Sequence, residues 1–302
     1  MSAARPCGLV DIGSNSVVLL IASRVGDDWT VLERVKHSVR LGAAIDPSGQ
    51  LAPAGVLRLQ AALADLLSQA QAYSAPLRVT ATASLRNVTN GAAIAAELGE
   101  QLGCSIEILS EKAEASAAFR GVWDAEGRGA QPMVVVDVGG GSSEVGWGAR
   151  GVMQGWLSLP IGGVRLSAPH QQADPVTPSD VNAMRRTLGD QIESLSLTAP
   201  GVPEAYACSG SIRRLCAMAG SQDDRLSCDD LDRVIDRLER AGWRAERLAL
   251  PGVDPGRVDV LLGAALIHQA LARRFAWGGF RLSRGGLRWG LLSDGFSQPL
   301  SL

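Results

Sequence analysis

Lysine and aromatic residues are scarce in this chain of 302 residues. Only Lys36 and Lys112 are lysines among 29 basic residues, and Phe, Trp and Tyr together make up 4% of the sequence. The core must therefore consist mainly of Leu, Val, Ala and Ile, which a hydrophobic content of 46% easily supplies. The preference for arginine over lysine indicates a high-GC genome first and an anion-binding design second.

The chain also lacks a charge excess and long apolar runs. A net charge of −2 argues against a broad nucleic-acid surface, although it allows a local arginine-lined site. No apolar run reaches the roughly 18 residues that a membrane span needs. No cleavable signal peptide fits before Asp11. We therefore expect a cytoplasmic protein that binds neither nucleic acid nor membrane.

The cysteines form no recognisable site. There are five of them, scattered along the chain, and no C-x-x-C or His/Cys spacing suggests zinc. We expect buried free thiols in a reducing compartment. They are Cys7, Cys104, Cys208, Cys216 and Cys228.

Two copies of one short pattern stand out instead. Residues 10–16 read V-D-I-G-S-N-S, and residues 136–144 read V-D-V-G-G-G-S-S-E. Each copy has an apolar run, an Asp and a Gly/Ser-rich turn, and another apolar run follows, which is typical of a strand–turn–strand unit. Such a turn can present N–H groups and hydroxyls to a phosphate, and the Asp is suited to hold a divalent cation. Two copies predict two related lobes that grip one phosphorylated ligand.

The remaining patterns predict an α/β fold in both halves. Residues 124–131 have no periodicity and form the best linker candidate, so we expect domains at 1–125 and 126–302, with the last helix packing back on the first domain. Strands are expected within 8–22, at 29–40, 78–82, 105–109, 204–208 and 279–283, with a second hairpin ending at 159. Helices are expected at 54–73, 91–102, 178–195, 229–241 and 257–275, and also beginning near Ser110, whose hydroxyl would be the N-cap, and near Gly285.

In this order the segments resemble the exopolyphosphatase/guanosine pentaphosphate phosphohydrolase (Ppx/GppA) family, part of the actin-like, sugar-kinase and heat-shock-ATPase superfamily. A lone D-x-G-x-x-S would be weak evidence, but six segments follow the family order over nearly the whole chain. They are Asp11–Ser16, Ala81–Asn87 (family A-T-S-A-L-R-D), Ile106–Val122 (I-S-G-x-E-E-A-R-L…G-V), Asp137–Glu144 (D-I-G-G-G-S-T-E), Ser158–Leu166 (S-L-P-L-G-A-V-R-L) and Ser283–Leu292 (S-D-G-G-L-R-E-G-L-L).

The resemblance implies two actin-like (ribonuclease H-like) domains with mixed sheets, flanking helices and an interdomain cleft. Longer family members add C-terminal helical domains related to HD phosphohydrolases, so we expect this sequence to represent the short two-domain branch. An HD-type metal site is not expected, because none of His37, His170 and His268 adjoins an Asp.

The resemblance also implies roles for individual residues. Asp11 and Asp137 are the natural pair to position Mg²⁺, with Mn²⁺ as an alternative. Glu114 would be the general base, and Glu144 a second carboxylate at the metal or the water. Arg86 would bind a phosphate oxygen as a planar donor. The N–H groups and hydroxyls of the two turns would cradle the phosphates: Gly13, Ser14, Asn15, Ser16, Gly139, Gly140, Gly141, Ser142 and Ser143.

Several of these residues have plainer interpretations. Either Asp could merely cap its turn, although two matching Gly/Ser loops make that a poor joint explanation. Taken alone, Glu114 would be a solvated helix residue and Arg86 a surface salt-bridge residue.

Two further groups are open to more than one interpretation. Ser142 and Ser143 could be nucleophiles, but no His base is near in sequence, so hydroxyl donors to phosphate are favoured. Arg213 and Arg214 follow the turn 209–211, and they could line a polyanion channel or be two exposed helix charges.

The chain departs from the family pattern around these motifs. Ala113 replaces the first Glu of E-E-A, Ser116 replaces an Arg, and Glu111 stands where the family has Gly. Arg284 stands for the Asp, and Trp289 for the Glu, of the last segment. The carboxylates assigned to the site are all retained, so we expect catalysis, and the departures leave reduced or altered substrate recognition open.

The leading hypothesis is a Mg²⁺-dependent phosphohydrolase that releases terminal phosphate from inorganic polyphosphate. The alternatives are hydrolysis of pppGpp to ppGpp, a sensor that binds polyphosphate or (p)ppGpp with little turnover, and, more distantly, a kinase. Two-lobe proteins of this kind often form homodimers, but no surface for one can be assigned from the sequence.

Overall fold

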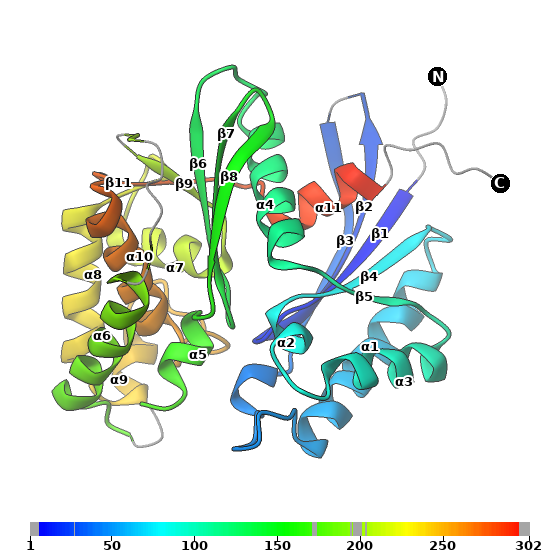
Figure 1. Cartoon of the computed structure of the whole chain (residues 1–302), viewed down its shortest axis with the longest axis horizontal. Helices are drawn as coiled ribbons and strands as arrows, with labels where there is room; N and C mark the ends of the chain where they lie inside the picture. Colours follow the sequence, from blue (N-terminus) through cyan, green and yellow to red (C-terminus); the bar gives the residue numbers. More distant parts are fainter. Residues whose placement is uncertain are drawn as a thin grey trace. The chain divides into compact units, whose positions relative to one another are not determined.

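Figure 1 shows the computed structural model of the chain, which describes residues 6–26, 28–170, 174–193, 195, 201–202 and 204–295. Its contacts divide it into two compact units. The first runs to Ala113 and takes in the chain from Leu291 onward, and the second covers Glu114–Gly290. This division differs from the expected boundary after residue 125. Helix α4 (Glu111–Ala125) is continuous across the junction, and its buried Phe119 and Val122 belong to a core cluster of the second unit, so most of the helix groups there.

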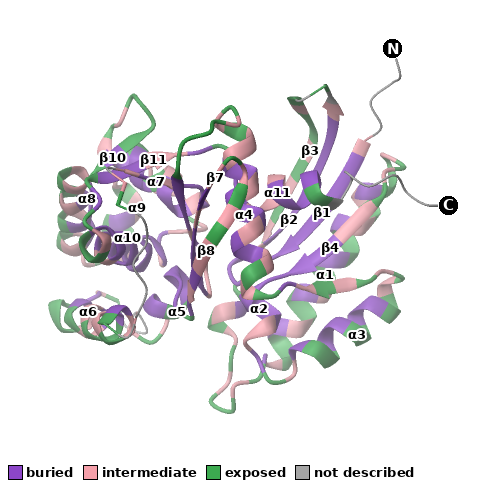
Figure 2. Cartoon of the chain, turned by 45° about the horizontal axis from the view of Figure 1, so that its top comes forward, coloured by how far each residue is buried: buried purple, intermediate pink, exposed green. Residues whose placement is uncertain are grey.

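The first unit contains a five-stranded mixed sheet in the order β3-β2-β1-β4-β5. Strands β1, β2 and β3 form an antiparallel meander, whereas β4 and β5 run parallel to β1. Figure 2 shows β1 buried and the edge strand β3 largely exposed. The strands are β1 (Pro6–Ile12), β2 (Ser16–Val25), β3 (Asp28–Ser38), β4 (Leu77–Ala81) and β5 (Ile106–Ile108).

Helices of the first unit pack on this sheet through apolar faces. In α1 the buried Leu59, Leu63 and Leu66 recur at helical spacing and join strand residues in one core cluster. A proline at the first position starts α1, where the missing N–H costs no helical hydrogen bond. The helices are η1 (Leu41–Ala43), α1 (Pro53–Gln71), α2 (Ala83–Arg86) and α3 (Gly91–Leu102), and the last helix, α11 (Leu287–Gly295), has its end in this unit.

The second unit contains a six-stranded sheet in the order β10-β11-β9-β6-β7-β8. Strands β6, β7 and β8 form an antiparallel meander, β9 and β11 run parallel to β6, and β10 is an antiparallel edge strand. The strands are β6 (Met133–Val138), β7 (Ser143–Ala149), β8 (Val152–Leu159), β9 (Ala205–Ala207), β10 (Arg225–Ser227) and β11 (Gly279–Leu282).

Helix α10 forms the centre of the helical layer in the second unit. Most of its residues are buried, and it contacts α5, α6, α7 and α8. A helix that is apolar nearly all round belongs in a core, as α10 does. The helices of this unit are α5 (Gly163–Ser167), α6 (Pro178–Glu193), α7 (Gly210–Ala219), α8 (Cys228–Arg240), α9 (Arg244–Ala249) and α10 (Leu261–Phe275).

The two units repeat one plan, in which parallel strands add to the first strand of a three-stranded meander. This confirms the predicted fold class, an α/β protein with two mixed sheets flanked by helices. That the units enclose a cleft remains a prediction. No helix in the described ranges combines the length and the apolar character that crossing a membrane requires.

Candidate active site

The first Asp/Gly pattern forms a tight turn between β1 and β2. The N–H of Gly13 donates to the carbonyl of Ser16 at 3.0 Å. The carbonyls of Ser14 and Asn15 accept N–H groups of residues 39–42, which follow β3, at 2.9–3.1 Å. In a trans peptide the C=O and the next N–H point in opposite directions. The N–H groups of Asn15 and Ser16 are therefore directed away from residues 39–42, as an anion-binding nest requires.

The second pattern repeats this geometry between β6 and β7. The N–H of Gly139 donates to the carbonyl of Ser142, again at 3.0 Å. The carbonyls of Gly139 and Gly140 accept N–H groups of residues 163–165, which follow β8, at 2.9–3.0 Å. By the same peptide geometry, the N–H groups of Gly140 and Gly141 are directed away from α5. The two predicted phosphate turns thus have the same closing hydrogen bond, and in both the segment after the third strand donates N–H groups to carbonyls of the turn, one position earlier in the second turn than in the first.

The residue before α5, Gly162, cannot carry a side chain. A Cβ placed on Gly162 would lie 2.6 Å from the carbonyl carbon of Gly140 and 2.7 Å from the carbonyl oxygen of Gly139. No side chain fits at such distances, so glycine at this position is what allows residues 163–165 to brace the turn.

Both turns lie at the carboxyl edge of parallel strands. In the first unit the paired row Ile12, Ala81 and Ile108 closes this edge of β1, β4 and β5. Arg86 leaves the same edge in α2, and its Nη1 donates to the carbonyl of Leu109 at 2.9 Å. That bond holds one nitrogen of the guanidinium beside the strand ends.

In the second unit the corresponding row is Val136, Ala207 and Leu282, on β6, β9 and β11. The next residue after Val136 is Asp137, so this carboxylate also stands at the carboxyl edge of the sheet. Open α/β sheets bind their ligands at this edge. The first unit places Asp11 in the same way, one residue before the end of β1.

Asp137 and Glu144 are brought together by the strand register. They are direct partners across the β6–β7 ladder, so their side chains share one face of the sheet with Cβ atoms about 5 Å apart. Glu144 is only 2% exposed, and its Oε1 accepts a hydrogen bond from the hydroxyl of Ser158 at 3.3 Å.

Glu114 comes from α4, which crosses the same face of this sheet. A Cβ on Gly146, which is two residues beyond Glu144 on β7, would lie 3.4 Å from the carbonyl of Ala115. Glu114 is 6% exposed, so the solvated-helix interpretation of this residue does not hold. The N-cap prediction for the helix is supported, because the hydroxyl of Ser110 accepts the N–H of Ala113 at 3.2 Å.

The carboxylates fit a metal that is completed by its ligand. Asp137 and Glu144 in the second unit, like Asp11 in the first, offer oxygen donors, the type that Mg²⁺ prefers. Within the described ranges no group of three or more His, Cys, Asp or Glu side chains could hold a metal ion. Mg²⁺ characteristically takes one or two carboxylates and completes its shell with water and substrate phosphates. The carboxylates of each unit, taken by themselves, therefore fit Mg²⁺ that completes its shell with water and phosphate.

The hydroxyl of Ser143 is used inside the protein. It donates to the carbonyl of Ile161 at 2.7 Å, and Ser143 is fully buried on the face of β7 opposite to Glu144. The hydroxyl proton is thus used in this hydrogen bond, so Ser143 could bind a phosphate only through its main-chain N–H. The nucleophile interpretation gains no support here.

One neighbour of the site was not found from the sequence. Cys208 follows β9, and its thiol lies against the carboxylate of Asp137. Burial raises the pKa of this thiol well above its usual range, and the charge of Asp137 raises it further. In the sequence, the position of Cys208 between a predicted strand and the S-G-S turn at residues 209–211 indicates that it lies at a strand end.

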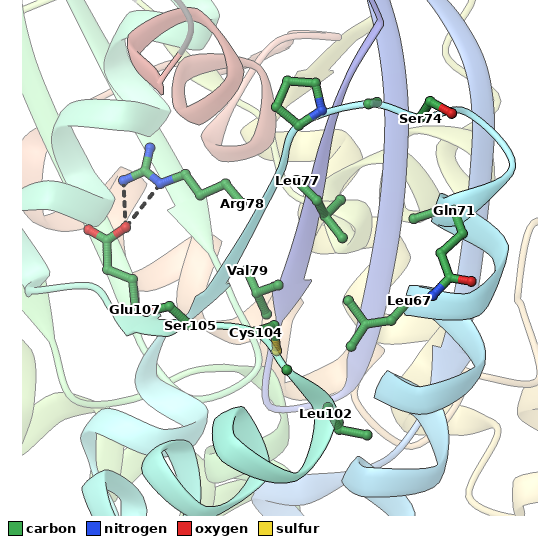
Figure 3. Close-up of a pocket in the computed structure, with 14 residues that line it drawn as sticks. Leu67, Gln71, Ser74, Leu77, Arg78, Val79, Leu102, Cys104, Ser105 and Glu107 are labelled. Carbon is green, nitrogen blue, oxygen red and sulfur yellow. Dashed lines mark hydrogen bonds and ion pairs between the residues drawn. The ribbon is translucent and has the colours of Figure 1, made fainter. Parts of the chain in front are cut away.

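A separate cavity of about 940 Å³ lies in the first unit (Figure 3). It is lined by the carboxyl ends of α1 and α3 and by the amino ends of β4 and β5, with Leu67, Leu77 and Leu102 among its apolar residues. Arg78 and Glu107 form an ion pair of 2.8 Å at its side. Because it opens at the amino ends of the parallel strands, it is distinct from the turn at their carboxyl ends.

Comparison with known proteins assigns the family. Exopolyphosphatase 2 of Mycobacterium tuberculosis is 32% identical over 286 residues, which covers 87% of this chain and 89% of that protein. The crystal structure of an exopolyphosphatase-like protein superposes with a TM-score of 0.87 at 25% identity, covering 97% of this chain and 98% of the other. An exopolyphosphatase from Cytophaga hutchinsonii shares the fold at a TM-score of 0.83 and 23% identity, with coverage of 97% and 98%. Residues 20–298 match the Ppx/GppA phosphatase family. The chain belongs to this family.

Proposed function

We propose that this protein is a Mg²⁺-dependent exopolyphosphatase, which hydrolyses the terminal phosphate from inorganic polyphosphate. The observation that carries the proposal is the pair of equivalent turns, each closed by the same 3.0 Å hydrogen bond and each preceded by an Asp. Two anion nests of one design suit a ligand that carries phosphates in series. The names of two relatives, exopolyphosphatase 2 and exopolyphosphatase, support the same substrate class.

The reaction needs charge neutralisation, an oriented water and a proton acceptor. Water oxygen attacks the terminal phosphorus, and the bond from that phosphorus to the bridging oxygen breaks, which leaves a chain shorter by one phosphate. The N–H groups of the two turns and the guanidinium of Arg86 stabilise charge on the phosphate oxygens. Asp11 and Asp137 would hold Mg²⁺, which, when bound, neutralises phosphate charge and acidifies water.

Glu114 and Glu144 take different parts because of their positions. Glu144 faces Asp137 across the ladder, so it would help to hold the metal or the attacking water. Glu114 projects from a helix rather than from the sheet, and it accepts the proton that the attacking water releases.

The test is phosphate release by the purified protein from polyphosphate of defined chain length, with Mg²⁺ or Mn²⁺ and with EDTA as a control. The proposal predicts metal-dependent release of orthophosphate, and Asp137→Asn should remove it. No release with either metal would overturn the proposal. Competition with pppGpp decides the substrate, since faster turnover of pppGpp would move the assignment to that nucleotide. Tight binding by calorimetry without release would assign a sensor.

A further inference from the structure

We propose that Arg213 and Arg284 form a second anion subsite beside Asp137, which binds phosphates of the polyphosphate chain inward of the terminal one. This inference rests on the proposed function and adds to it the residues that recognise chain length. It concerns the second unit alone.

The sheet register brings both arginines to the edge where Asp137 stands. The N–H of Cys208 donates to the carbonyl of Val136, and the N–H of Ser283 donates to the carbonyl of Ala207 at 2.9 Å. The segments after β9 and after β11 therefore leave the sheet beside the end of β6. Arg213 lies in α7, which follows β9, and Arg284 directly follows Ser283 in the segment after β11.

The two residues are in direct contact. Nη2 of Arg213 donates to the main-chain carbonyl of Arg284 at 3.3 Å, so α7 and the loop after β11 are tied together. The guanidinium of Arg284 lies 3.8 Å from Asp224, and its side chain is 85% exposed. An ion pair this long and this exposed is worth little, so Arg284 can exchange it for a phosphate at small cost.

Three arginines, Arg213, Arg284 and Arg288, lie near one another here. Burial, followed by the charge of Arg288 and more weakly that of Arg284, lowers the pKa of Arg213, while Cys208 and Asp224 act in the opposite direction. Cys208 in turn lies against Asp137, so the arginine cluster adjoins that carboxylate. Guanidinium groups held close together repel one another, and a bound polyanion relieves that repulsion.

Arg213 and Arg214 thus have different roles, although the sequence does not separate them. Arg214 pairs with Asp254 at 3.5 Å and is exposed, which agrees with a surface helix charge. Arg213 is half-buried and joins the cluster. Arg284 stands where the family pattern has Asp, so this chain carries a positive charge at a position where the pattern has a negative one. The subsite is therefore not a property of that pattern.

Arg284→Asp is the main test, because an exposed side chain can be reversed in charge without unfolding the protein. We expect KM for long-chain polyphosphate to rise about tenfold, the effect of losing one or two charge-assisted contacts, while KM for tripolyphosphate changes far less. The dependence of KM on salt should also become shallower. Arg213→Gln should shift KM in the same direction.

Arg186→Asp is the matched control, since Arg186 is an exposed arginine on α6 and its replacement changes the net charge equally. An equal rise of KM in the control, or equal rises for short and long chains in Arg284→Asp, would overturn the subsite. Calorimetric binding of long-chain polyphosphate separates this result from a failure of the proposed function. If the wild type releases no phosphate, the subsite still requires Arg284→Asp to bind that chain about tenfold more weakly, and unchanged binding would refute it.

Discussion

At the scale of single residues, burial distinguishes Glu114 from the ordinary glutamates of a helix surface. Glu114 is 6% exposed on α4, and burial of a carboxylate costs free energy that a purely structural surface residue would not require. Glu114→Gln keeps the shape but removes the proton acceptor, so kcat on polyphosphate should fall about 10²- to 10⁴-fold with little change in substrate affinity. Steady-state phosphate release together with calorimetric binding measures both quantities.

Glu111→Gln provides the control for this substitution. Glu111 is the first residue of the same helix, and it stands where the family pattern has Gly. The control should retain the wild-type kcat. If Glu114→Gln also retained it, Glu114 could not be the proton acceptor.

His268 should make the free energy of unfolding depend on pH. It is fully buried on α10, its Nδ1 contacts the carbonyl of Ala264 at 2.7 Å, and its ring meets Phe280 edge-on. Burial lowers the pKa of His268 from 6.5 to about 4. The unfolded chain therefore binds this proton near pH 6.5 while the folded chain does not, so stability is full above that pH and falls as the pH drops towards 4. The loss amounts to about 3 kcal/mol.

Urea unfolding between pH 4 and pH 8 tests this assignment. His268→Phe removes the titrating group and should flatten that part of the fall. His37→Gln should keep the fall, because His37 is an exposed residue paired with Asp65. An unchanged pH profile in His268→Phe would show that other groups cause the fall.

At the scale of elements, the glycine before α5 supports the second phosphate turn. Gly162→Ala would push its Cβ into the backbone of Gly139 and Gly140, and overpacking of this kind costs about 1–3 kcal/mol. Both the free energy of unfolding and kcat should fall. Gly189→Ala on α6 is the contrast, since a Cβ there meets no other atom within 4 Å. It should stabilise the protein by about 0.5–1 kcal/mol and leave kcat unchanged. Equal effects of the two substitutions would argue that Gly162 has no special part in the turn.

Elements with strong periodicity could be predicted from the sequence. Helix α3 has the predicted bounds, Gly91–Leu102, while α8 is shifted by one residue at each end and β11 ends one residue early. Some short elements were missed, although the three-residue strands β5 and β9 lie within the predicted ranges 105–109 and 204–208. Helix α7 was expected only as a turn, although the Ser209 hydroxyl caps it by accepting the N–H of Ile212. The predicted start of α10 at residue 257 was early, because residues 251–260 form turns in which Asp254 accepts the N–H of Gly256.

The site was predictable to a similar extent. The two turns follow from local sequence, because an Asp and a Gly/Ser run between apolar segments specify a strand–turn–strand unit. The contact of Cys208 with Asp137 follows from the parallel pairing of β6 with β9, and distant pairing leaves no trace in local periodicity. The role of Glu114 was inferred from the family resemblance, since spacing alone does not distinguish it.

At the scale of the whole molecule, the repeated plan is the main constraint on how the protein works. Each unit carries one turn and one Asp at the carboxyl edge of its own sheet. The proposed function assigns the phosphates and the Mg²⁺ of one substrate to the turns and Asp side chains of both units. Mg²⁺ alone should then change the thermal midpoint little, while Mg²⁺ with a non-hydrolysable polyphosphate analogue at 100 times its Kd should stabilise the protein by about 2.7 kcal/mol.

Asp11→Asn and Asp137→Asn test whether both units bind the ligand, because one residue belongs to each unit. If both units hold the same ligand and metal, each substitution should remove most of the stabilisation that Mg²⁺ and the analogue give together, as measured by calorimetry. Asp28→Asn, on the exposed edge strand β3, makes the same chemical change elsewhere in the first unit and should keep the full stabilisation. Should Asp11→Asn behave like Asp28→Asn, the ligand would be held by the second unit alone, and the first turn would need another function.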